Sequence, residues 1–507
     1  MIRFKVVSQD GAPRQVQAAG SHLFGPDDIP VRGQLQVEGD EIVGMRHSET
    51  AVGLATLWEV GRVGKMFLQT TRLPSRERPY ILNVELARAR LLRISQKREE
   101  WGAADLSLPE EHRELIDEAL DRFIAALCQL DEPAAAGRLA DEALTLALQG
   151  GEALALAHGR AHLERRNSAQ GFARHSFGCC LDPKRMGDPK YLKHVKEQFH
   201  FVTVPMTWRD LEPEEQKRDF GVLDECVRWL NHQRIAAKVG PLLTFSPPGV
   251  PDWLYIWEHD FEQVREMAYE FVRAVVERYG PKVQAWDVIS GMNAENCFKF
   301  SFDQLLEMTR SAALAAKRAS PRSLVLIELT EPWGEYYATN QRTVPPLIYA
   351  DMIGQSGVPF DGYGIRVRFG WGGEGMRTRD LLELASLLDR FAVLGRPVHL
   401  SGVQAPSAAD SRDNSGKGGE AGYWHGPWSE AVQADWLEQV YQVALSRSYV
   451  ETVTWQDLAD RGAGGVMRHG GLLREDLTAK PAFARLVGLK NALVRAERKS
   501  GRGAQGE

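Results

Sequence analysis

The pattern of apolar and polar residues changes near residue 175, and the pattern that begins there covers the larger part of the chain. From there, short apolar runs, typical of buried strands, alternate with segments whose apolar residues recur at helical spacing. The expected strands cover residues 177–181, 201–204, 239–245, 284–289, 323–329, 362–369, 397–403 and 450–455. The expected helices include residues 219–232, 261–279, 302–319, 378–394, 429–446 and 481–493. Strands that each lead into a helix predict an α/β fold, a closed (β/α)8 TIM barrel over residues 175–495, with its site at the carboxyl ends of the strands.

The chain before the barrel has a different pattern. Residues 1–90 contain short alternating runs separated by Gly, Pro and Asp, which predict a small β-rich domain. Its Trp58 and Phe67 are either a sugar-stacking face or, as we prefer, core aromatics. Residues 91–170 carry apolar residues at helical spacing and predict a helical hairpin that acts as a spacer, interrupted at Gly150-Gly151. Residues 496–507 are expected to form a disordered tail.

Composition narrows the classes of function. The net charge of −6 gives no electrostatic case for nucleic acid or an anionic membrane as a partner. The N-terminus lacks the apolar core of a signal peptide, and no apolar run reaches the roughly 18 residues of a membrane span. The five cysteines form no CxxC pair, so we expect a reduced, cytoplasmic protein. For Cys179-Cys180 we prefer two buried thiols over a metal site, and we expect neither metal nor cofactor.

Residues 284–296, QAWDVISGMNAEN, form a buried strand that runs into a polar turn. Further motifs follow the predicted barrel strands in order: GPLLTFSPPGVPDW at 240–253, DGYGIRVRF at 361–369, VHLSGVQ at 398–404, TWQDLAD at 454–460 and KPAF at 480–483. Together they resemble glycoside hydrolase family ten, the endo-1,4-β-xylanase family. The resemblance implies a TIM barrel that acts on or recognises oligosaccharides of the β-1,4-glycan or xylan class.

The departures from the family pattern fall on the chemistry. The resemblance places Gly291 where the family has its acid/base Glu and Gly402 where it has its nucleophile Glu. A retaining hydrolase needs both carboxyl groups, and glycine supplies neither, so the ordinary family mechanism is not expected. The family's Gln and His on the sixth strand are Arg366 and Arg368 here. Because alternate residues of a strand share a face, both arginines are expected on one face, in an internal ion-pair network or against an acidic sugar.

Other side chains at the strand ends are candidates for a relocated site. Three carboxylates are candidates for replacing the missing pair: Glu295, Glu328 and Glu331. Aromatic faces and polar groups are candidates for binding substrate: Trp208, Trp253, Asn293, Arg366, Arg368, Gln404, Trp424, Trp455 and Asp457. Tryptophan faces pair with the C–H faces of sugars, although each one alone is more often a packing residue.

Three functions remain open from the sequence. The first is a glycan-active enzyme with relocated carboxylates, and the second is a carbohydrate-binding pseudoenzyme. The third is an assembly scaffold, with an oligomer formed through the N-terminal region. The expected ligand of the first two is an oligosaccharide, acidic if the arginines face it. Fold alone does not decide among them, because barrels host many chemistries.

Overall fold

The structure is a computed structural model. It describes residues 1–8, 18–46, 50–102, 108–169, 171–340, 342–409, 420–462 and 466–503, with side chains described through residue 494.

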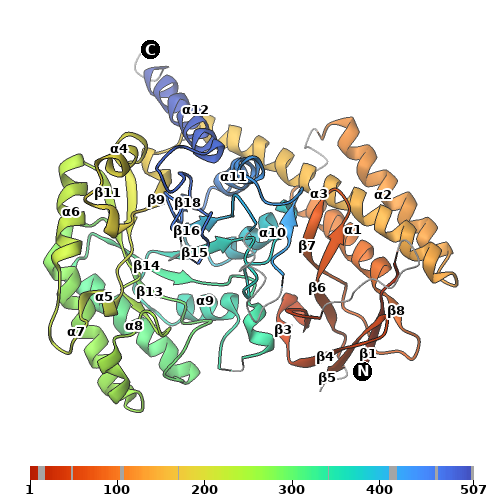
Figure 1. The fold of residues 1–507 in the computed structure, drawn as a ribbon, viewed down its shortest axis with the longest axis horizontal. Helices are drawn as coiled ribbons and strands as arrows, with labels where there is room; N and C mark the ends of the chain where they lie inside the picture. Colours follow the sequence, from red (N-terminus) through yellow and green to blue (C-terminus); the bar gives the residue numbers. More distant parts are fainter. Residues whose placement is uncertain are drawn as a thin grey trace.

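Eight parallel strands close into a barrel, which confirms the predicted (β/α)8 fold (Figure 1). They are β9 (Phe177–Cys180), β10 (Phe201–Val204), β11 (Ala236–Val239), β13 (Ala285–Ser290), β14 (Leu324–Leu329), β15 (Gly362–Arg368), β16 (Val398–Gln404) and β18 (Val450–Trp455). Each strand pairs in parallel with the next, and β18 pairs with β9 to complete the ring. The carboxyl ends of all eight strands therefore meet at one rim, where the candidate site residues were expected.

The third strand is displaced from its prediction. The apolar run at 239–245 predicted one strand, but the barrel strand is β11, which ends at Val239, and only the short β12 (Leu243–Thr244) falls inside the run. Gly240 and Pro241 separate the two, and proline has no N–H to donate to a neighbouring strand. The prediction missed β11 because this strand contains Lys238, and a charged residue interrupts an apolar pattern.

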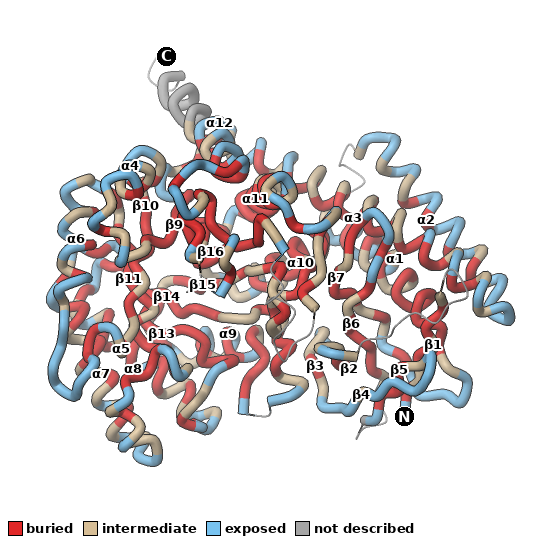
Figure 2. Tube along the Cα trace, viewed as in Figure 1, coloured by how far each residue is buried: buried red, intermediate tan, exposed pale blue. Residues whose placement is uncertain are grey.

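Helices surround the barrel (Figure 2). They are α4 (Pro189–Gln198), α5 (Trp208–Leu211), α6 (Gly221–Gln233), α7 (Phe261–Tyr279), α8 (Phe302–Ala319), α9 (Pro346–Gln355), α10 (Leu381–Ala392), α11 (Glu430–Leu445) and α12 (Pro481–Gly503). In α4, α6, α7 and α8, buried residues alternate with exposed or partly exposed ones. Several of these helices have an N-cap residue whose side chain accepts a hydrogen bond from a backbone N–H in the first turn. Asp260 caps α7 in this way, and Ser301 caps α8. The helix α12 continues to Gly503, through residues expected to form a disordered tail, and residues 504–507 lie outside the described chain.

The N-terminal region contains two small sheets. The first has the order β4 (Gly33–Glu38), β5 (Glu41–Arg46), β1 (Ile2–Lys5) and β8 (Tyr80–Ile81). The second has the order β17 (Tyr423–Trp424), β7 (Gly64–Gln69), β6 (Gly53–Val60), β2 (His22–Phe24) and β3 (Pro30–Val31). Because β17 belongs to the segment that follows β16, the barrel chain supplies an edge strand of this sheet. Trp58 and Phe67 are both buried, Trp58 in the main core and Phe67 in a small neighbouring cluster.

Three helices link the sheets to the barrel: α1 (Leu82–Glu100), α2 (Glu110–Cys128) and α3 (Pro133–Ala169). The long helix α3 runs along the barrel helices α10 and α11 (Figure 1). It continues without interruption through Gly150-Gly151, so the predicted break is wrong. A β-carbon placed on Gly150 would lie 2.6 Å from Ile116 Cγ1 of α2. The glycine therefore allows close approach of two helices. The described residues also form six short 3-10 turns: Pro26–Asp28, Arg174–Ser176, Pro183–Arg185, Asp252–Trp257, Gly280–Lys282 and Glu335–Ala338.

Substituting Gly150 with leucine is expected to destabilise the protein by about 3 kcal/mol, because the added side chain overpacks the contact with α2. Gly488 on α12 is the matched control, since a β-carbon there meets no atom within 4 Å. Gly488→Leu should stabilise slightly, by less than about 1 kcal/mol, because leucine is the better helix former. Urea unfolding of both variants checks this; equal stabilities would show that α2 and α3 are not tightly packed at this point.

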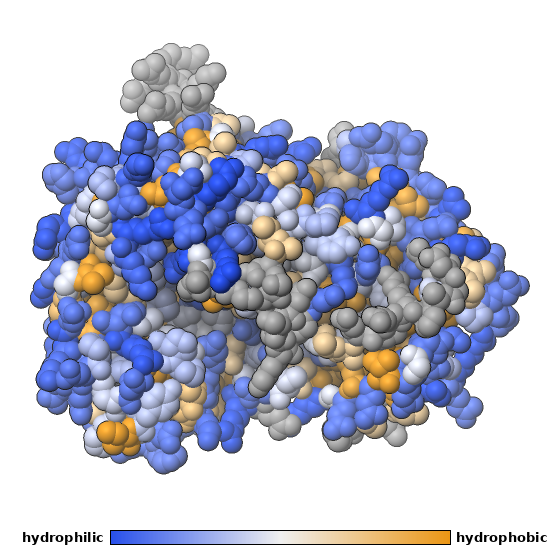
Figure 3. Space-filling model, viewed as in Figure 1, coloured by the Kyte–Doolittle hydropathy of each residue, from blue (hydrophilic) through white to orange (hydrophobic). Residues whose placement is uncertain are grey.

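The surface shown in Figure 3 is mainly hydrophilic, with separated hydrophobic patches. Among the described helices, none combines the length and apolar character needed to cross a bilayer.

Candidate functional site

A buried carboxylate, Glu328 on β14, lies at the centre of the strand ends and is only 2% exposed. Ser290 Oγ on β13 donates a hydrogen bond of 2.5 Å to it. Ser401 Oγ on β16 and the guanidinium of Arg366 on β15 donate to it as well. Burial alone would raise the pKa of Glu328, but Arg366, Lys238 and the two serine hydrogen bonds hold it below its ordinary value. Glu328 is therefore an ionised carboxylate whose two oxygens are both occupied.

A second ion pair lies in the barrel interior. Lys238 Nζ on β11 contacts Asp287 Oδ2 on β13 at 2.6 Å, and both side chains are almost completely buried. Burial raises the pKa of Asp287, although Lys238 opposes the shift. The barrel interior thus holds two ion pairs, Lys238–Asp287 and Arg366–Glu328, and interior charges of this kind are retained only when each is matched.

Arg366 and Arg368 differ in their partners, although the strand pattern had grouped them. Arg366 is paired with Glu328, which matches the internal-network alternative. Arg368 has no hydrogen bond or ion pair within the part of the chain that the structure describes. Burial and the neighbouring Arg366 lower the pKa of Arg368 to about 10, so it remains a cation at neutral pH. A half-buried guanidinium without a carboxylate partner is costly unless an anion or water satisfies it.

Glu331 follows β14 in a left-handed backbone conformation, with φ of 49°. Burial and the charges of Glu295, Glu374 and Glu335 raise the pKa of Glu331 to about 8, with Arg368 opposing. Its carboxyl group makes no hydrogen bond to any described residue. Glu295, in the turn after β13, is exposed. The charges of Glu295 and Arg368 therefore both act on Glu331, whereas Glu328 is engaged by Arg366 and two serines.

The two glycines that the motifs place at catalytic positions differ in their surroundings. Gly291 follows β13 at φ 74°, a conformation that side chains rarely adopt, and its N–H donates to the backbone carbonyl of Glu328 at 3.1 Å. Gly402 lies on β16 opposite Arg366. A β-carbon on Gly402 would lie 2.3 Å from Gln456 Oε1, so the amide of Gln456 fills the space beside this glycine.

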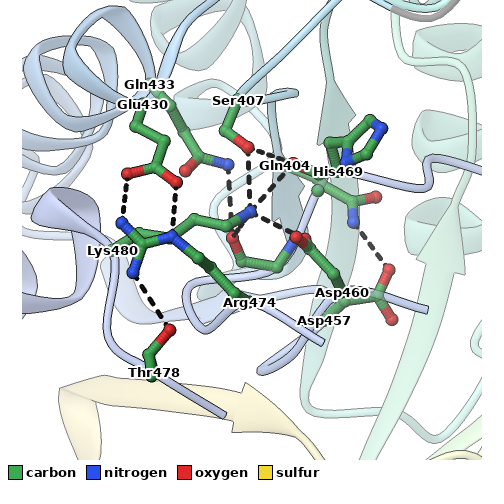
Figure 4. Close-up of polar contacts among 12 residues, drawn as sticks. Gln404, Ser407, Glu430, Gln433, Asp457, Asp460, His469, Arg474, Thr478 and Lys480 are labelled. Carbon is green, nitrogen blue, oxygen red and sulfur yellow. Dashed lines mark hydrogen bonds and ion pairs between the residues drawn. The ribbon is translucent and has the colours of Figure 1, made fainter. Parts of the chain in front are cut away.

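Gln404 and Asp457 belong to a polar network that fixes the turns after β16 and β18 (Figure 4). Gln404 Nε2 donates to Asp457 Oδ2 at 2.6 Å, and Arg461 pairs with Oδ1 of the same carboxylate at 2.5 Å. Burial raises the pKa of Asp457, and both partners oppose the shift. Beside them, the buried Lys480 donates to Asp460 Oδ1 at 2.7 Å and to Ser407 Oγ at 2.8 Å. Gln404 and Asp457 are thus held by protein partners.

Asn293 and the tryptophans at the rim pack against the protein. Asn293 Nδ2 donates to the Thr330 carbonyl at 2.8 Å and to the Tyr336 hydroxyl at 2.7 Å, which joins the turns after β13 and β14. Trp208 is buried against Phe271 and Trp253, and Trp253 is half-buried, with its indole N–H on the Glu212 carbonyl. Trp455 is fully buried and donates to the Gly470 carbonyl at 2.9 Å.

Trp424 lies apart from these residues. It is on β17, at the edge of the N-terminal sheet, and its indole N–H donates to Glu152 Oε1 of α3 at 2.7 Å. Glu152 also contacts His425 Nε2 at 2.5 Å. The contacts of Trp424 and His425 with Glu152 therefore connect the segment after β16 to helix α3 of the N-terminal region.

The comparisons with known proteins agree with the barrel. Residues 165–488, which are more than half of the chain, match the sequence profile of glycosyl hydrolase family 10. The chain belongs to this family. An endo-1,4-beta-xylanase/feruloyl esterase of Xylanibacter ruminicola is 22% identical over 332 residues, which are 60% of this chain and 44% of that protein. Endo-1,4-beta-xylanase B of Thermotoga neapolitana is 20% identical over 282 residues, which are 54% of this chain and 73% of that protein. The chain thus spans less than half the length of the first of these curated relatives.

Solved structures of family 10 share the fold. Native xylanase 10B from Thermotoga maritima matches with a TM-score of 0.51 at 16% identity and covers 67% of this chain and 99% of its own. A family 10 structure from Paenibacillus barcinonensis matches with a TM-score of 0.50 at 18% identity and covers 66% of this chain and 97% of its own. At such identities, the likeness establishes the fold alone.

Sequence reasoning missed the residues that complete the centre of this family 10 barrel. Ser290 donates to Oε2 of Glu328 and Ser401 donates to Oε1, and each serine directly precedes one of the two glycines. The Ser-Gly dipeptide repeated in both motifs was the available signal. Lys238 had no such signal, because its partner Asp287 lies on another strand. Among the described residues, no group of three or more His, Cys, Asp and Glu side chains is arranged to hold a metal ion.

Proposed function

We propose that the carboxyl end of this family 10 barrel binds an acidic oligosaccharide of the β-1,4-glycan or xylan class and does not cleave it by the ordinary retaining mechanism. The observation that carries the proposal is Arg368, a half-buried cation at the strand ends whose guanidinium has no ion pair to any described residue. A uronic or sulfated substituent would supply the missing anion through paired N–H donors. The glycan class rests on family membership and on the xylanase names of the curated relatives.

The absence of ordinary turnover follows from the carboxylates at the strand ends. The motif resemblance assigns the acid/base position to Gly291 and the nucleophile position to Gly402, and retaining hydrolysis needs two carboxyl groups about 5–5.5 Å apart. Glu328 does not replace either one. Its oxygens are held by Arg366 and two serines, and its lowered pKa keeps it ionised at neutral pH. It is neither a proton donor nor a free nucleophile.

A second candidate function, hydrolysis by relocated carboxylates, is favoured by Glu331. A carboxyl group with a pKa of about 8 is protonated at neutral pH and is suited to act as a general acid. Glu295, an exposed carboxylate whose charge contributes to that shift, would be its ionised partner. Inverting hydrolysis uses one protonated and one ionised carboxyl group in this way.

One pair of measurements tests both candidates. Calorimetry with xylotetraose bearing a glucuronic acid branch should detect binding, and incubation with an aryl xylobioside should release no aryl alcohol. Turnover that declines as pH rises through about 8, and that Glu331→Gln abolishes, would establish the second candidate instead, because deprotonation removes the general acid. Failure to bind any xylo-oligosaccharide would refute the first.

A further inference from the structure

The side-chain amide of Gln456 occupies an unusual place at the strand ends. Gln456 follows β18, and its backbone N–H donates to the Val403 carbonyl of β16 at 3.0 Å. Its side chain extends over Gly402, where Oε1 would be 2.3 Å from a β-carbon on that residue. The same β-carbon would be 3.2 Å from Arg366 Cγ. The amide therefore lies beside the position of the family's nucleophile, next to the arginine that pairs with Glu328.

The amide has no protein partner within the described chain. No side-chain hydrogen bond joins Gln456 to a described residue, although the residue is partly buried. The neighbouring Gln404 is different, because its amide donates to Asp457 (Figure 4). Polar groups withdrawn from bulk water normally have a hydrogen-bond partner. The free donor and acceptor of Gln456 therefore face a ligand or water.

We propose that Gln456 is a sugar-contacting residue that takes the place of the nucleophile carboxylate beside Gly402. This inference rests on the proposed function and names the side chain that holds the sugar ring. An amide both donates and accepts, so it matches a sugar hydroxyl, which has the same two roles. An amide is also neutral and is not an effective nucleophile toward the anomeric carbon. The exchange thus retains a polar contact with the sugar while removing the covalent step.

The geometry predicts that Gly402 and Gln456 act as one unit. Gly402→Ala would force the amide to move, because the added methyl group would occupy the place of Oε1. Gln456→Ala would remove the amide altogether. Each substitution should weaken the binding of neutral xylotetraose by about 5- to 10-fold, the value of one lost hydrogen bond. The double variant should show the same 5- to 10-fold loss, since the second change removes nothing further.

Calorimetry with xylotetraose on the full chain tests this, with thermal melting to verify that each variant is folded. Gln36→Ala, on the exposed strand β4, is the matched control and should bind as the unsubstituted protein does. Binding by Gln456→Ala equal to that of the unsubstituted protein would overturn the inference and leave the proposed function standing. Losses that multiply in the double variant would also overturn it, because the two residues would then act independently. If the unsubstituted protein bound the glucuronic-acid-branched xylotetraose but not neutral xylotetraose, this inference would fail and the proposed function would stand. If it bound neither ligand, both would be refuted.

Discussion

Replacing Arg368 with alanine is expected to weaken binding of an acid-substituted xylo-oligosaccharide by about 10- to 100-fold, the value of one charge-assisted contact of about 1.5–3 kcal/mol. Binding of the neutral oligosaccharide should change by less than about 3-fold. The difference arises because Arg368 has no carboxylate partner among the described residues, so its removal leaves no buried anion behind. Calorimetry with paired acidic and neutral ligands measures both affinities.

Arg322→Ala is the matched control for this test. Arg322 is exposed and precedes β14, so it lies at the amino end of the strand, away from the site at the carboxyl ends. Arg366 is unsuitable, because its removal would leave the buried Glu328 without its cation and would destabilise the fold. Because Arg368 is half-buried, moderate salt should reduce the acidic preference only in part. Equal affinities of the unsubstituted protein for the two ligands would show that Arg368 has a structural role.

The sequence predicted those parts of the fold that depend on local pattern. β10, β18, α7 and α8 lie at the predicted residues, because each is a short apolar run or a clear amphipathic period bounded by turn residues. The prediction of the third strand failed because Lys238 interrupts its apolar pattern. This lysine is buried because Asp287 on another strand neutralises it. The break predicted at Gly150-Gly151 failed because the glycines are required by a neighbouring helix.

The chemistry of the site was less accessible to the sequence, because it depends on contacts between distant residues. Glu328 was an expected candidate, but its engagement by Ser290 and Ser401 follows from the barrel register, which brings together residues 38 and 73 positions away. Arg366 and Arg368 share a strand face, yet within the described part of the chain only Arg366 contacts a carboxylate. Trp424 was a substrate-binding candidate at the strand ends, but it lies on β17, which pairs with β7 of the N-terminal sheet. Local pattern contains none of these pairings.

The largest stability loss is expected at the junction of the barrel with the N-terminal sheet, for Glu335→Gln. Glu335 is buried and accepts from Arg377 Nη1 at 2.5 Å, from the Gly375 N–H at 3.0 Å and from Arg379. Both guanidinium groups also lie over the ring of Phe67, at 5.3 and 5.0 Å from its centre. Glu335→Gln would remove the carboxylate charge that both buried guanidinium groups contact, at a cost of about 3–5 kcal/mol at pH 7.

The pH dependence of that loss has a definite direction. Burial would raise the pKa of Glu335, but Arg379, Arg377 and His22 lower it from 4.5 to about 2. A carboxyl group with a depressed pKa contributes its full stability above about pH 4.5 and loses it as pH falls toward 2. That contribution is on the order of 3 kcal/mol at pH 7 and on the order of 1 kcal/mol at pH 3. The difference between the unsubstituted protein and Glu335→Gln should therefore shrink by more than half on acidification.

Urea unfolding of the unsubstituted protein and of Glu335→Gln, at pH 7 and at pH 3, measures this difference. Because the two proteins are compared with each other at each pH, the influence of other titrating groups is limited. His22 is the nearest of these, since it stacks on Phe67, and burial lowers its pKa to about 4. Glu262→Gln is the matched control, because the Glu262 side chain is 70% exposed and its ion pair with Arg265 should contribute less than about 0.5 kcal/mol. A Glu335→Gln effect that is the same at both pH values would show that the loss comes from packing. The junction would then be held together by the Phe67 contacts and the β7–β17 pairing, with the buried charges contributing little.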